Sequence, residues 1–246
     1  MGIDVEPHPR FRGIYQVLFE DGSGKLATRN LAAGHAVYGE RLVKHGNVEY
    51  RVWDPYRSKL AAAIMKGLET VPIEPGLRVL YLGAASGTTA SHVSDIIGEK
   101  GQVYCVEFAP RSIRELVENV CVHRPNMSPI LADARMPEQY ASLVGKVEVV
   151  YCDIAQPEQA RILADNADMF LLLRGWTLIA IKAQSIDVTK EPAEVYKGEI
   201  SILKTRGFRV GQVVPLEPYD KAHVMIVTQR RIKQENNLNI HPKKSF

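Results

Sequence analysis

The sequence has few cysteines, little net charge and no long apolar run, and each shortage narrows the class of protein. The most apolar stretch, MFLLLRGWTLIAIKA, is interrupted by Arg174, Gly175 and Lys182. A membrane span needs about 18 or more apolar residues in succession, so none is expected. The first residues, MGIDVEPHPRFRG, carry charges where a secretory signal needs an apolar segment. We therefore expect a cytoplasmic protein without a membrane partner.

The cysteines give no sign of a metal site or a disulfide framework. Cys105, Cys121 and Cys152 lack the spacing of metal ligands, and their number is odd. Cys105 and Cys152 lie inside apolar, strand-like runs, which indicates buried and unreactive thiols. The histidines show no metal spacing either, so no metal is expected.

The formal net charge is only +3, which neither requires nor excludes a nucleic-acid partner. Basic residues gather at the end of the chain, in QRRIKQENNLNIHPKKSF. This pattern is typical of a solvated terminus, and we treat residues 233–246 as a basic C-terminal tail.

The first fifth of the chain predicts a small antiparallel β domain, residues 1–54. Between residues 10 and 53, short alternating segments such as YQVLFE, GERLVK and VEYRVW are separated by glycine-containing turns. Asp54 as a cap and Pro55 at a first helical position then predict a helix that begins near residue 55. Leu60, Ile64 and Leu68 supply its apolar face.

Residues 55–232 predict an α/β domain with a mostly parallel sheet. Apolar, β-rich runs alternate with helix-like stretches, the arrangement of strands joined by crossover helices. The strand candidates are RVLYLG, QVYCVE, SPILAD, VEVVYCD, TLIAIKA, FRVGQVVPL and AHVMIVTQRR. The last two are joined by EPYDK without a helix, so one of them should run antiparallel.

The loop after the first of these strands, LGAASGTT, is not a phosphate-binding loop. A dinucleotide fingerprint needs glycine where Ala85 and Thr88 stand, and a P-loop needs a lysine that is absent. Small residues at the carboxyl end of a strand leave room for a less anionic, nucleoside-like ligand. Alternatively, Gly83 and Gly87 serve only to let helix and strand pack closely.

Acidic residues follow the next strands at corresponding positions. Glu107 can accept from both hydroxyls of a ribose, Asp133 can accept from an adenine amino group, and Asp153 ends a further strand. Each alone is often a simple turn residue, but together they converge on one crevice. This pattern resembles the S-adenosylmethionine-dependent methyltransferase fold, a Rossmann-like seven-stranded sheet that also ends in a β-hairpin.

The resemblance narrows to one family. LGAASGTTASHVSDIIG, VYCVEFAPRS, CDIAQPEQ, IKAQSID and DPYRSKLAAAI together resemble the fibrillarin family, in its archaeal form of RNA 2′-O-methyltransferases. The likeness covers nearly the whole chain, including the N-terminal β domain with YGER. It departs from eukaryotic members in having no glycine- and arginine-rich extension, which favours the archaeal form.

The resemblance implies a Lys-Asp-Lys-His catalytic set, which falls on Lys59, Asp153, Lys182 and His223. A ribose hydroxyl is a poor nucleophile, so it must be aligned with the sulfonium methyl and lose its proton as the bond forms. Lys182 is the candidate to bind or to deprotonate that hydroxyl. Even without the resemblance, Lys182 ends the apolar run TLIAI and must reach water or a partner there.

The resemblance also implies the contacts of S-adenosyl-L-methionine. Thr88 and Thr89 fall at its methionine end, Glu107 and Phe108 at ribose and adenine, with Phe108 able to stack on the adenine ring. The implied set is Gly83, Ala84, Ala85, Gly87, Thr88, Thr89, Glu107, Phe108, Asp133, Ala134, Asp153, Ile154, Ala155 and Gln156.

The implied function is methylation of ribose 2′-hydroxyls in rRNA, and in tRNA, as the catalytic subunit of a box C/D guide ribonucleoprotein. The implied partners are the guide RNA, the target RNA, a Nop-domain scaffold protein and a kink-turn-binding, ribosomal-protein-like subunit. Guide pairing would select the nucleotide, which suits the modest charge of the chain. A stand-alone RNA ribose methyltransferase, which should carry Glu at His223, and a non-catalytic assembly module remain alternatives; the loop glycines argue against a nucleotide-dependent oxidoreductase.

Overall fold

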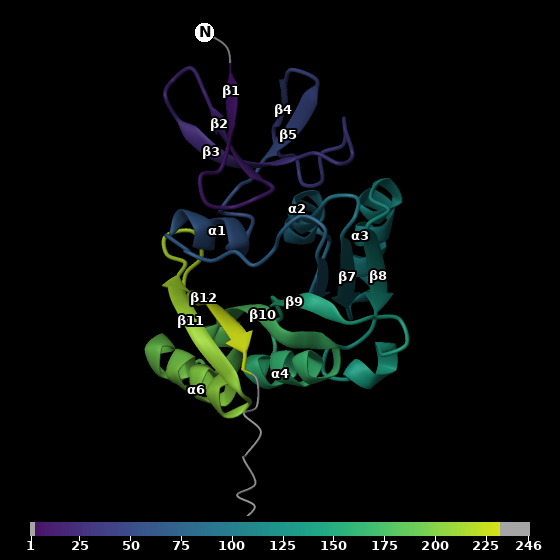
Figure 1. Cartoon of the computed structure of the whole chain (residues 1–246). Coiled ribbons are helices and arrows are strands. Elements are labelled where there is room, and N and C mark those ends of the chain that lie inside the picture. Colours follow the sequence, from purple (N-terminus) through teal and green to yellow (C-terminus); the bar gives the residue numbers. More distant parts are fainter. Residues whose placement is uncertain (1–2, 232–246) are drawn as a thin grey trace, which may run out of the picture.

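The computed structural model describes residues 3–231 and divides them between two β-sheets, the smaller above the larger in Figure 1. The tail 233–246 lies outside the described residues. The smaller sheet is antiparallel throughout, in the order β1-β2-β3-β5-β4. Its strands are β1 (Asp4–Pro7), β2 (Ile14–Leu18), β3 (Gly24–Arg29), β4 (Leu42–His45) and β5 (Val48–Val52).

The small antiparallel sheet was predicted, but two of its strands were not. β1 buries only Val5, and β3 begins at Gly24, inside the segment that the sequence marks as a turn. Neither strand therefore gives a clear alternating signal. Tertiary pairing with β2 from both sides holds them in the sheet.

The larger sheet has seven strands in the order β11-β12-β10-β9-β6-β7-β8. These are β6 (Arg78–Leu82), β7 (Gln102–Glu107), β8 (Met127–Leu131), β9 (Val147–Cys152), β10 (Leu171–Lys182), β11 (Phe208–Pro215) and β12 (His223–Arg230). β12 runs antiparallel to both neighbours, which confirms the prediction for the final pair. The carboxyl ends of the parallel strands and the start of β12 consequently share one edge.

Helices cover both faces of the larger sheet, as the alternating side chains of β6 require. Val79 and Tyr81 belong to the core that includes α1, α2 and α3, whereas Leu80 and Leu82 belong to the core beneath α4 and α6. The helices are α1 (Lys59–Met65), α2 (Thr88–Ile97), α3 (Pro110–Asn119), α4 (Gln159–Phe170), α5 (Ala183–Ile186) and α6 (Pro192–Thr205). Short 3₁₀ turns are η1 (Cys121–His123) and η2 (Pro137–Tyr140).

The predicted start of the first helix near residue 55 is wrong. The Asp54 side chain accepts from the Tyr56 amide, and the Arg57 amide donates to the Asp54 carbonyl, so these residues form a turn. Ser58 is extended and caps α1, its hydroxyl accepting from the Ala61 amide. The helix therefore begins at Lys59, which places that lysine at the first helical position.

A buried polar network joins the two sheets. Asp95 on α2 accepts from Arg51 of β5 and Thr28 of β3, each at 2.8 Å, and from Arg124 after η1. Arg51 also donates to Glu40 at 2.6 Å. All five side chains are removed from solvent, so this junction is held by ion pairs whose charges are satisfied inside the protein.

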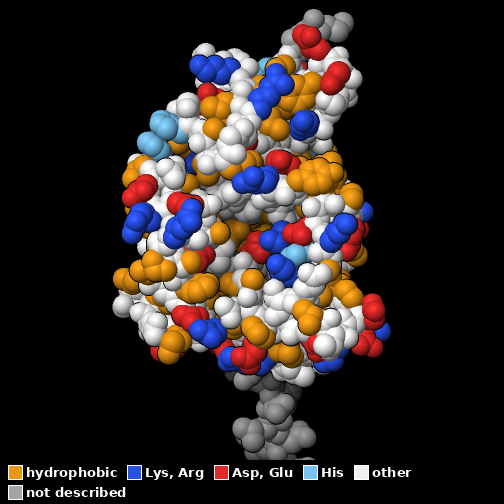
Figure 2. Space-filling model, turned by 180° about the vertical axis from the view of Figure 1, so that it is seen from behind, with side chains coloured by type: hydrophobic (Ala, Val, Ile, Leu, Met, Phe, Trp, Pro, Cys, Tyr) orange, Lys and Arg blue, Asp and Glu red, His pale blue; other side chains and the backbone are white. Residues whose placement is uncertain are grey.

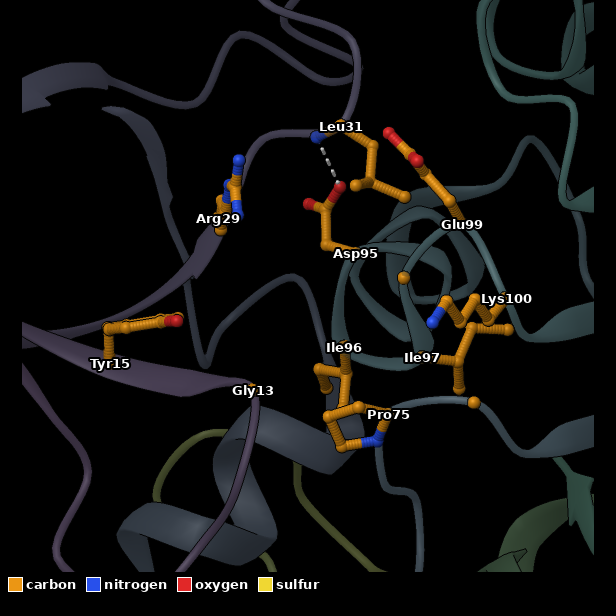
Figure 3. Close-up of a pocket in the computed structure, with 12 residues that line it drawn as sticks. Gly13, Tyr15, Arg29, Leu31, Pro75, Asp95, Ile96, Ile97, Glu99 and Lys100 are labelled. Carbon is orange, nitrogen blue, oxygen red and sulfur yellow. Dashed lines mark hydrogen bonds between the residues drawn. The ribbon is translucent and has the colours of Figure 1, made fainter. Parts of the chain in front are cut away.

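Beside this network, a pocket of about 470 Å³ opens between the small sheet and the end of α2 (Figure 3). Tyr15 and Arg29 line it from the sheet, and Ile97 and Lys100 from α2 and the turn after it. In the same view the Leu31 amide donates to Asp95 at 3.0 Å. This pocket lies against the interior network, at the opposite end of α2 from its first residue, Thr88.

Two further expectations concern the burial of cysteines and the absence of a membrane span. Cys105 and Cys152 are free and buried, as predicted, and burial raises the pKa of both thiols. Between residues 3 and 231, no helix is both long and apolar enough to cross a membrane.

Candidate functional site

A pocket of about 340 Å³ opens at the carboxyl edge of the larger sheet, over β6, β7 and β9. The structure brings together here most residues that the resemblance assigns to the methyl donor. Those that line the pocket are Gly83, Ala85, Glu107, Phe108, Asp133, Ala134, Asp153, Ile154, Ala155 and Gln156. Ala84, Gly87, Thr88 and Thr89 do not line it.

The two loop glycines are needed for close packing. Both have positive φ, +81° at Gly83 and +95° at Gly87. A Cβ on Gly83 would collide with the backbone of Asp153, and one on Gly87 would lie 2.7 Å from the Leu116 side chain on α3. The packing explanation of these glycines is therefore supported, and the tight loop also shapes the floor of the pocket.

Glu107 ties this loop to the start of α3. One carboxylate oxygen accepts from the Ala85 amide and the other from the Ala109 amide, each at 2.9 Å. The residue is only 7% exposed yet lines the pocket. A carboxylate held by two amides keeps lone pairs for further donors, such as sugar hydroxyls.

The part of the pocket that the resemblance assigns to adenine has a polar and an aromatic wall. Arg135 holds the Asp133 carboxylate through several hydrogen bonds, and these lower the pKa of Asp133. Phe108 is 62% exposed and lines the pocket, so its ring is accessible to a ligand there.

Thr89 lies in the interior instead of the pocket. Its hydroxyl donates to Ser58 at 3.0 Å, so the first turn of α2 is joined to the cap of α1. Thr88, the first residue of α2, is partly exposed beside it. The contact fixes the position of α1, which carries Lys59.

The four predicted catalytic residues come from four segments that meet at this edge. Lys59 opens α1, Asp153 follows β9, Lys182 ends β10 and His223 begins β12. Lys182 and His223 are direct partners in the β10–β12 ladder. Figure 2 shows basic, acidic and histidine side chains gathered in a hollow in the middle of one face.

Asp153 forms an ion pair with Lys59, whose ammonium lies 3.0 Å from its nearer carboxylate oxygen. Among the described residues, the Asp153 carboxylate is thus directed to Lys59 and forms no ion pair with Lys182. Burial alone would lower the pKa of Lys59, but the Asp153 carboxylate outweighs this and the pKa is raised above its ordinary value. Lys59 is a permanent cation and cannot accept a proton near neutral pH.

Lys182 is held through its backbone. The amide of Lys182 donates to the Gln159 side chain at 3.1 Å, and the Gln159 side chain donates to the Lys182 carbonyl at 3.5 Å. In the described part of the chain, no carboxylate lies within ion-pair distance of the Lys182 ammonium. Its charged end is left for a ligand or solvent.

Asp220, which was not predicted from the sequence, links the two halves of this cluster. One carboxylate oxygen lies 2.9 Å from Nδ1 of His223, and the other lies 3.9 Å from the Lys59 ammonium. The Lys221 carbonyl is 2.7 Å from the same Nδ1. Because both neighbours only accept, Nδ1 carries the hydrogen, and in the neutral ring Nε2 is the acceptor. The available signal was the acid three residues before His223 in YDKAHV.

The chain is similar to known proteins over nearly its whole length. The family model described as Fibrillarin matches residues 5–232. The fibrillarin-like rRNA/tRNA 2′-O-methyltransferase of Methanopyrus kandleri is 59% identical over 227 residues, which are 92% of this chain and 97% of that protein.

Two crystal structures are similar over almost the whole chain. Aeropyrum pernix fibrillarin, with natively bound S-adenosyl-L-methionine, is 54% identical, with a TM-score of 0.87 over 92% of this chain and 98% of the other. A fibrillarin/Nop5p complex gives 41% identity and a TM-score of 0.77 over 90% and 99%. On the family match and these identities, the chain belongs to the fibrillarin family.

Proposed function

We propose that this protein transfers the methyl group of S-adenosyl-L-methionine to ribose 2′-hydroxyls of rRNA and tRNA. The observation that carries the proposal is the meeting of Lys59, Asp153, Lys182 and His223 beside the carboxyl-edge pocket. The Methanopyrus kandleri relative bears the name of an rRNA/tRNA 2′-O-methyltransferase, which supports this reaction.

The carboxyl-edge pocket suits a cationic nucleoside better than a nucleotide. Its lining contains three carboxylates: Asp133 is paired with Arg135 and Asp153 with Lys59, which leaves Glu107 as the carboxylate without a cationic partner among the described residues. A phosphate would be repelled there, whereas a sulfonium would be attracted. Its volume of about 340 Å³ lies within the range of small-molecule sites. When bound, the sulfonium supplies an electrophilic methyl group.

The residues around that methyl group divide the remaining tasks. We assign Lys182 to the target hydroxyl, because its ammonium has no carboxylate partner among residues 3–231. Lys59 holds Asp153 in place at the end of β9. Nε2 of His223 is the acceptor available nearby, so the proton of the hydroxyl has a route away from the forming bond.

We further propose that the protein works in a box C/D guide ribonucleoprotein. The fibrillarin/Nop5p structure supports docking on a Nop-domain scaffold. Guide RNA, target RNA and a kink-turn-binding subunit complete the proposed particle. Because the guide selects the target nucleotide by base pairing, this chain, whose net charge is only +3, need not recognise the RNA sequence itself. We also propose a cytoplasmic location. The proposed domains are the small β domain (1–54), the methyltransferase domain (55–232) and the basic C-terminal tail (233–246).

The test is methyl transfer from labelled S-adenosylmethionine to target RNA, with and without guide RNA and scaffold proteins. Lys182→Ala should lower kcat by about 10²- to 10⁴-fold, because the hydroxyl loses its positioning or proton-accepting group. Calorimetry should give nearly unchanged cofactor affinity. Lys100→Ala, at the distant pocket beside α2, is the matched control and should act like the parent.

Three results would count against the proposal in different ways. Undiminished turnover of Lys182→Ala removes the role of that lysine. Efficient, site-specific methylation by the isolated chain favours a stand-alone enzyme. Failure of the parent protein to bind S-adenosylmethionine favours a non-catalytic assembly module.

A further inference from the structure

The start of α4 contacts the end of β10 through one buried side chain, that of Gln159. Its side-chain oxygen accepts from the Lys182 amide at 3.1 Å, and its side-chain nitrogen donates to the Lys182 carbonyl at 3.5 Å. Gln159 is completely buried, so water does not compete for either contact. Both backbone groups of Lys182 therefore depend on a residue of another element.

These contacts occur where a neighbouring strand has ended. β9 pairs with β10 as far as Cys152 and Ile179, and in the part of the chain that the structure describes no strand continues beyond this point on that side. The amides of successive strand residues point to opposite sides, and the Ala183 amide donates to Ala222, which precedes β12. The backbone groups of Lys182 therefore point to the side where β9 is missing.

The side chain of Gln159 suits this gap. A primary amide carries both a donor and an acceptor, as a peptide group does. It can therefore satisfy the amide and the carbonyl of Lys182 together, in place of the next strand. Without such a partner these two backbone groups would lose their hydrogen bonds in a buried place, and the end of β10 would be less well fixed.

The side chain of Lys182 lies on the other face of the sheet from α4. Of the residues before it, Ile179 and Ile181 belong to the core beneath α4 and α6. Leu178 and Ala180 belong to the core that includes α1. Because side chains alternate along a strand, the Lys182 side chain lies on the face of α1, with the catalytic cluster. α4 therefore holds the backbone of the lysine and leaves its ammonium free.

A second buried residue, Glu199 on α6, fixes the start of α4. Its carboxylate accepts from the Ala160 amide at 2.7 Å, and the residue is only 5% exposed. This amide belongs to the first turn, where amides have no partner within the helix. Glu158, which precedes the helix, gives no side-chain cap and instead pairs with Arg161. Glu199 therefore acts as the cap of α4 from a different helix.

We propose that Gln159 and Glu199 are positioning residues for Lys182 in methyl transfer. Glu199 fixes the start of α4, and Gln159 fixes the backbone from which the lysine side chain extends to the target hydroxyl. Neither residue lines the carboxyl-edge pocket. A misplacement of about 1 Å in a reacting group can lower a rate by about 10²-fold, so this support should affect turnover. The inference rests on the proposed function, which assigns Lys182 to the hydroxyl.

The first measurement is kcat of the reconstituted guide particle, per S-adenosylmethionine-binding site. Gln159→Met keeps the length of the side chain but forms neither hydrogen bond, and should lower kcat by about 10- to 100-fold. KM for target RNA and cofactor affinity should stay unchanged. The matched control is Thr228→Val, which removes a buried hydrogen bond to Thr177 in the same sheet and should keep kcat. An unaltered kcat in Gln159→Met would overturn the proposal.

A double-mutant cycle separates positioning from a general loss of stability. In a Lys182→Ala background, Gln159→Met should change the residual kcat by less than about twofold, because no lysine side chain is left to position. A further fall as large as that in the parent background would show that Gln159 does not act through Lys182. The proposal would then be wrong.

A pair of variants at Glu199 tests the cap and stays informative if Gln159→Met does not fold. Glu199→Gln keeps an acceptor for the Ala160 amide, whereas Glu199→Leu removes it. Burial raises the pKa of Glu199, so loss of the charge itself should matter little. We expect kcat within about threefold of the parent for Glu199→Gln and about tenfold lower for Glu199→Leu. Equal kcat in Glu199→Leu and the parent would contradict the proposal.

Amide hydrogen exchange tests the contact without methyl transfer. In the full-length chain, the Lys182 amide should exchange at least about tenfold faster in Gln159→Met than in the parent, while the Leu178 amide should exchange equally in both. Equal exchange at Lys182 would overturn the inference. If exchange at Lys182 responds but the parent particle does not methylate RNA, the proposed function fails while the support of Lys182 by Gln159 stands.

Discussion

Among single residues, Asp220 has the most informative position, since it touches His223 and lies near Lys59. Asp220→Ala should lower kcat by roughly 10- to 100-fold, because a hydrogen bond to a charged group contributes about 1.5–3 kcal/mol. Asp220→Asn keeps an acceptor for Nδ1 and should lose less. Glu115→Ala, on the surface of α3, is the control.

A purely structural role for Asp220 would give a different result. ¹⁵N chemical shifts of the His223 ring should report hydrogen on Nδ1 in the parent and a changed ring environment in Asp220→Ala. The affinity for S-adenosylmethionine should be equal in both proteins. Unchanged kcat together with unchanged ring shifts would show that Asp220 does not position His223.

The candidate site was predictable where its residues end strands. Asp153 and Lys182 follow apolar runs, and a charged group there must lie at the carboxyl edge of the sheet. Lys59 gives no such signal, because a lysine near a helix start is usually solvated, and only the family resemblance identifies it. Asp220 has a local signal in its spacing to His223, but its second contact, with Lys59 on α1, joins residues that are distant in the sequence.

At the scale of elements, the junction between the small sheet and α2 depends on Asp95. This carboxylate has no exposed surface and holds both Arg51 and Arg124. Asp95→Asn should reduce the free energy of unfolding by about 3–5 kcal/mol, since it leaves buried guanidinium charge uncompensated. Thermal denaturation followed by circular dichroism should show a fall in Tm of roughly 10 °C.

The control for Asp95→Asn is Glu115→Ala, which breaks the exposed Arg111–Glu115 pair and should leave Tm almost unchanged. Equal Tm values for Asp95→Asn and the parent would mean that the network adds no stability. A fall of similar size in both variants would indicate that the effect is not specific to the junction.

Helices and strands were predictable where the apolar pattern decides the structure. The larger sheet was found strand by strand, because its buried runs are long and rich in β-branched residues. The start of α1 was misplaced because Asp54 and Pro55, good helix-start residues, instead close a turn ahead of Ser58. Both Asp54 and Ser58 are suitable helix caps, so the local sequence allows α1 to begin after either. The hydrogen bond from Thr89 to Ser58 favours the start after Ser58.

At the scale of the whole molecule, His92 makes stability depend on pH. Its ring lies between Thr28 and Tyr38, at 2.7 Å from each hydroxyl, inside the junction of the two sheets. Burial, and then the positive charges of Arg51 and Arg124, hold the pKa of His92 well below its ordinary value of 6.5. At acidic pH the unfolded chain therefore binds a proton at His92 that the folded protein does not bind.

The free energy of unfolding therefore falls toward acidic pH. The neutral His92 ring contributes its full stabilisation above the pKa of the unfolded chain, about 6.5. Below that pH the contribution is lost, and the free energy of unfolding falls by up to about 1.4 kcal/mol per pH unit. Urea unfolding at pH 7.5, 6.5 and 5.5 should show the decline. His92→Gln should flatten it, and an identical decline in that variant would assign the effect to other groups.

The direction of β12 has a practical consequence. The strand begins at the catalytic edge with His223 and ends at the opposite edge with Arg230, in the downward direction of Figure 1. A tether attached at the end of this strand therefore leaves from the far side of the sheet. Protein immobilised in this way should keep its crevice open to solution, so single particles on a glass surface can be watched while they assemble with RNA.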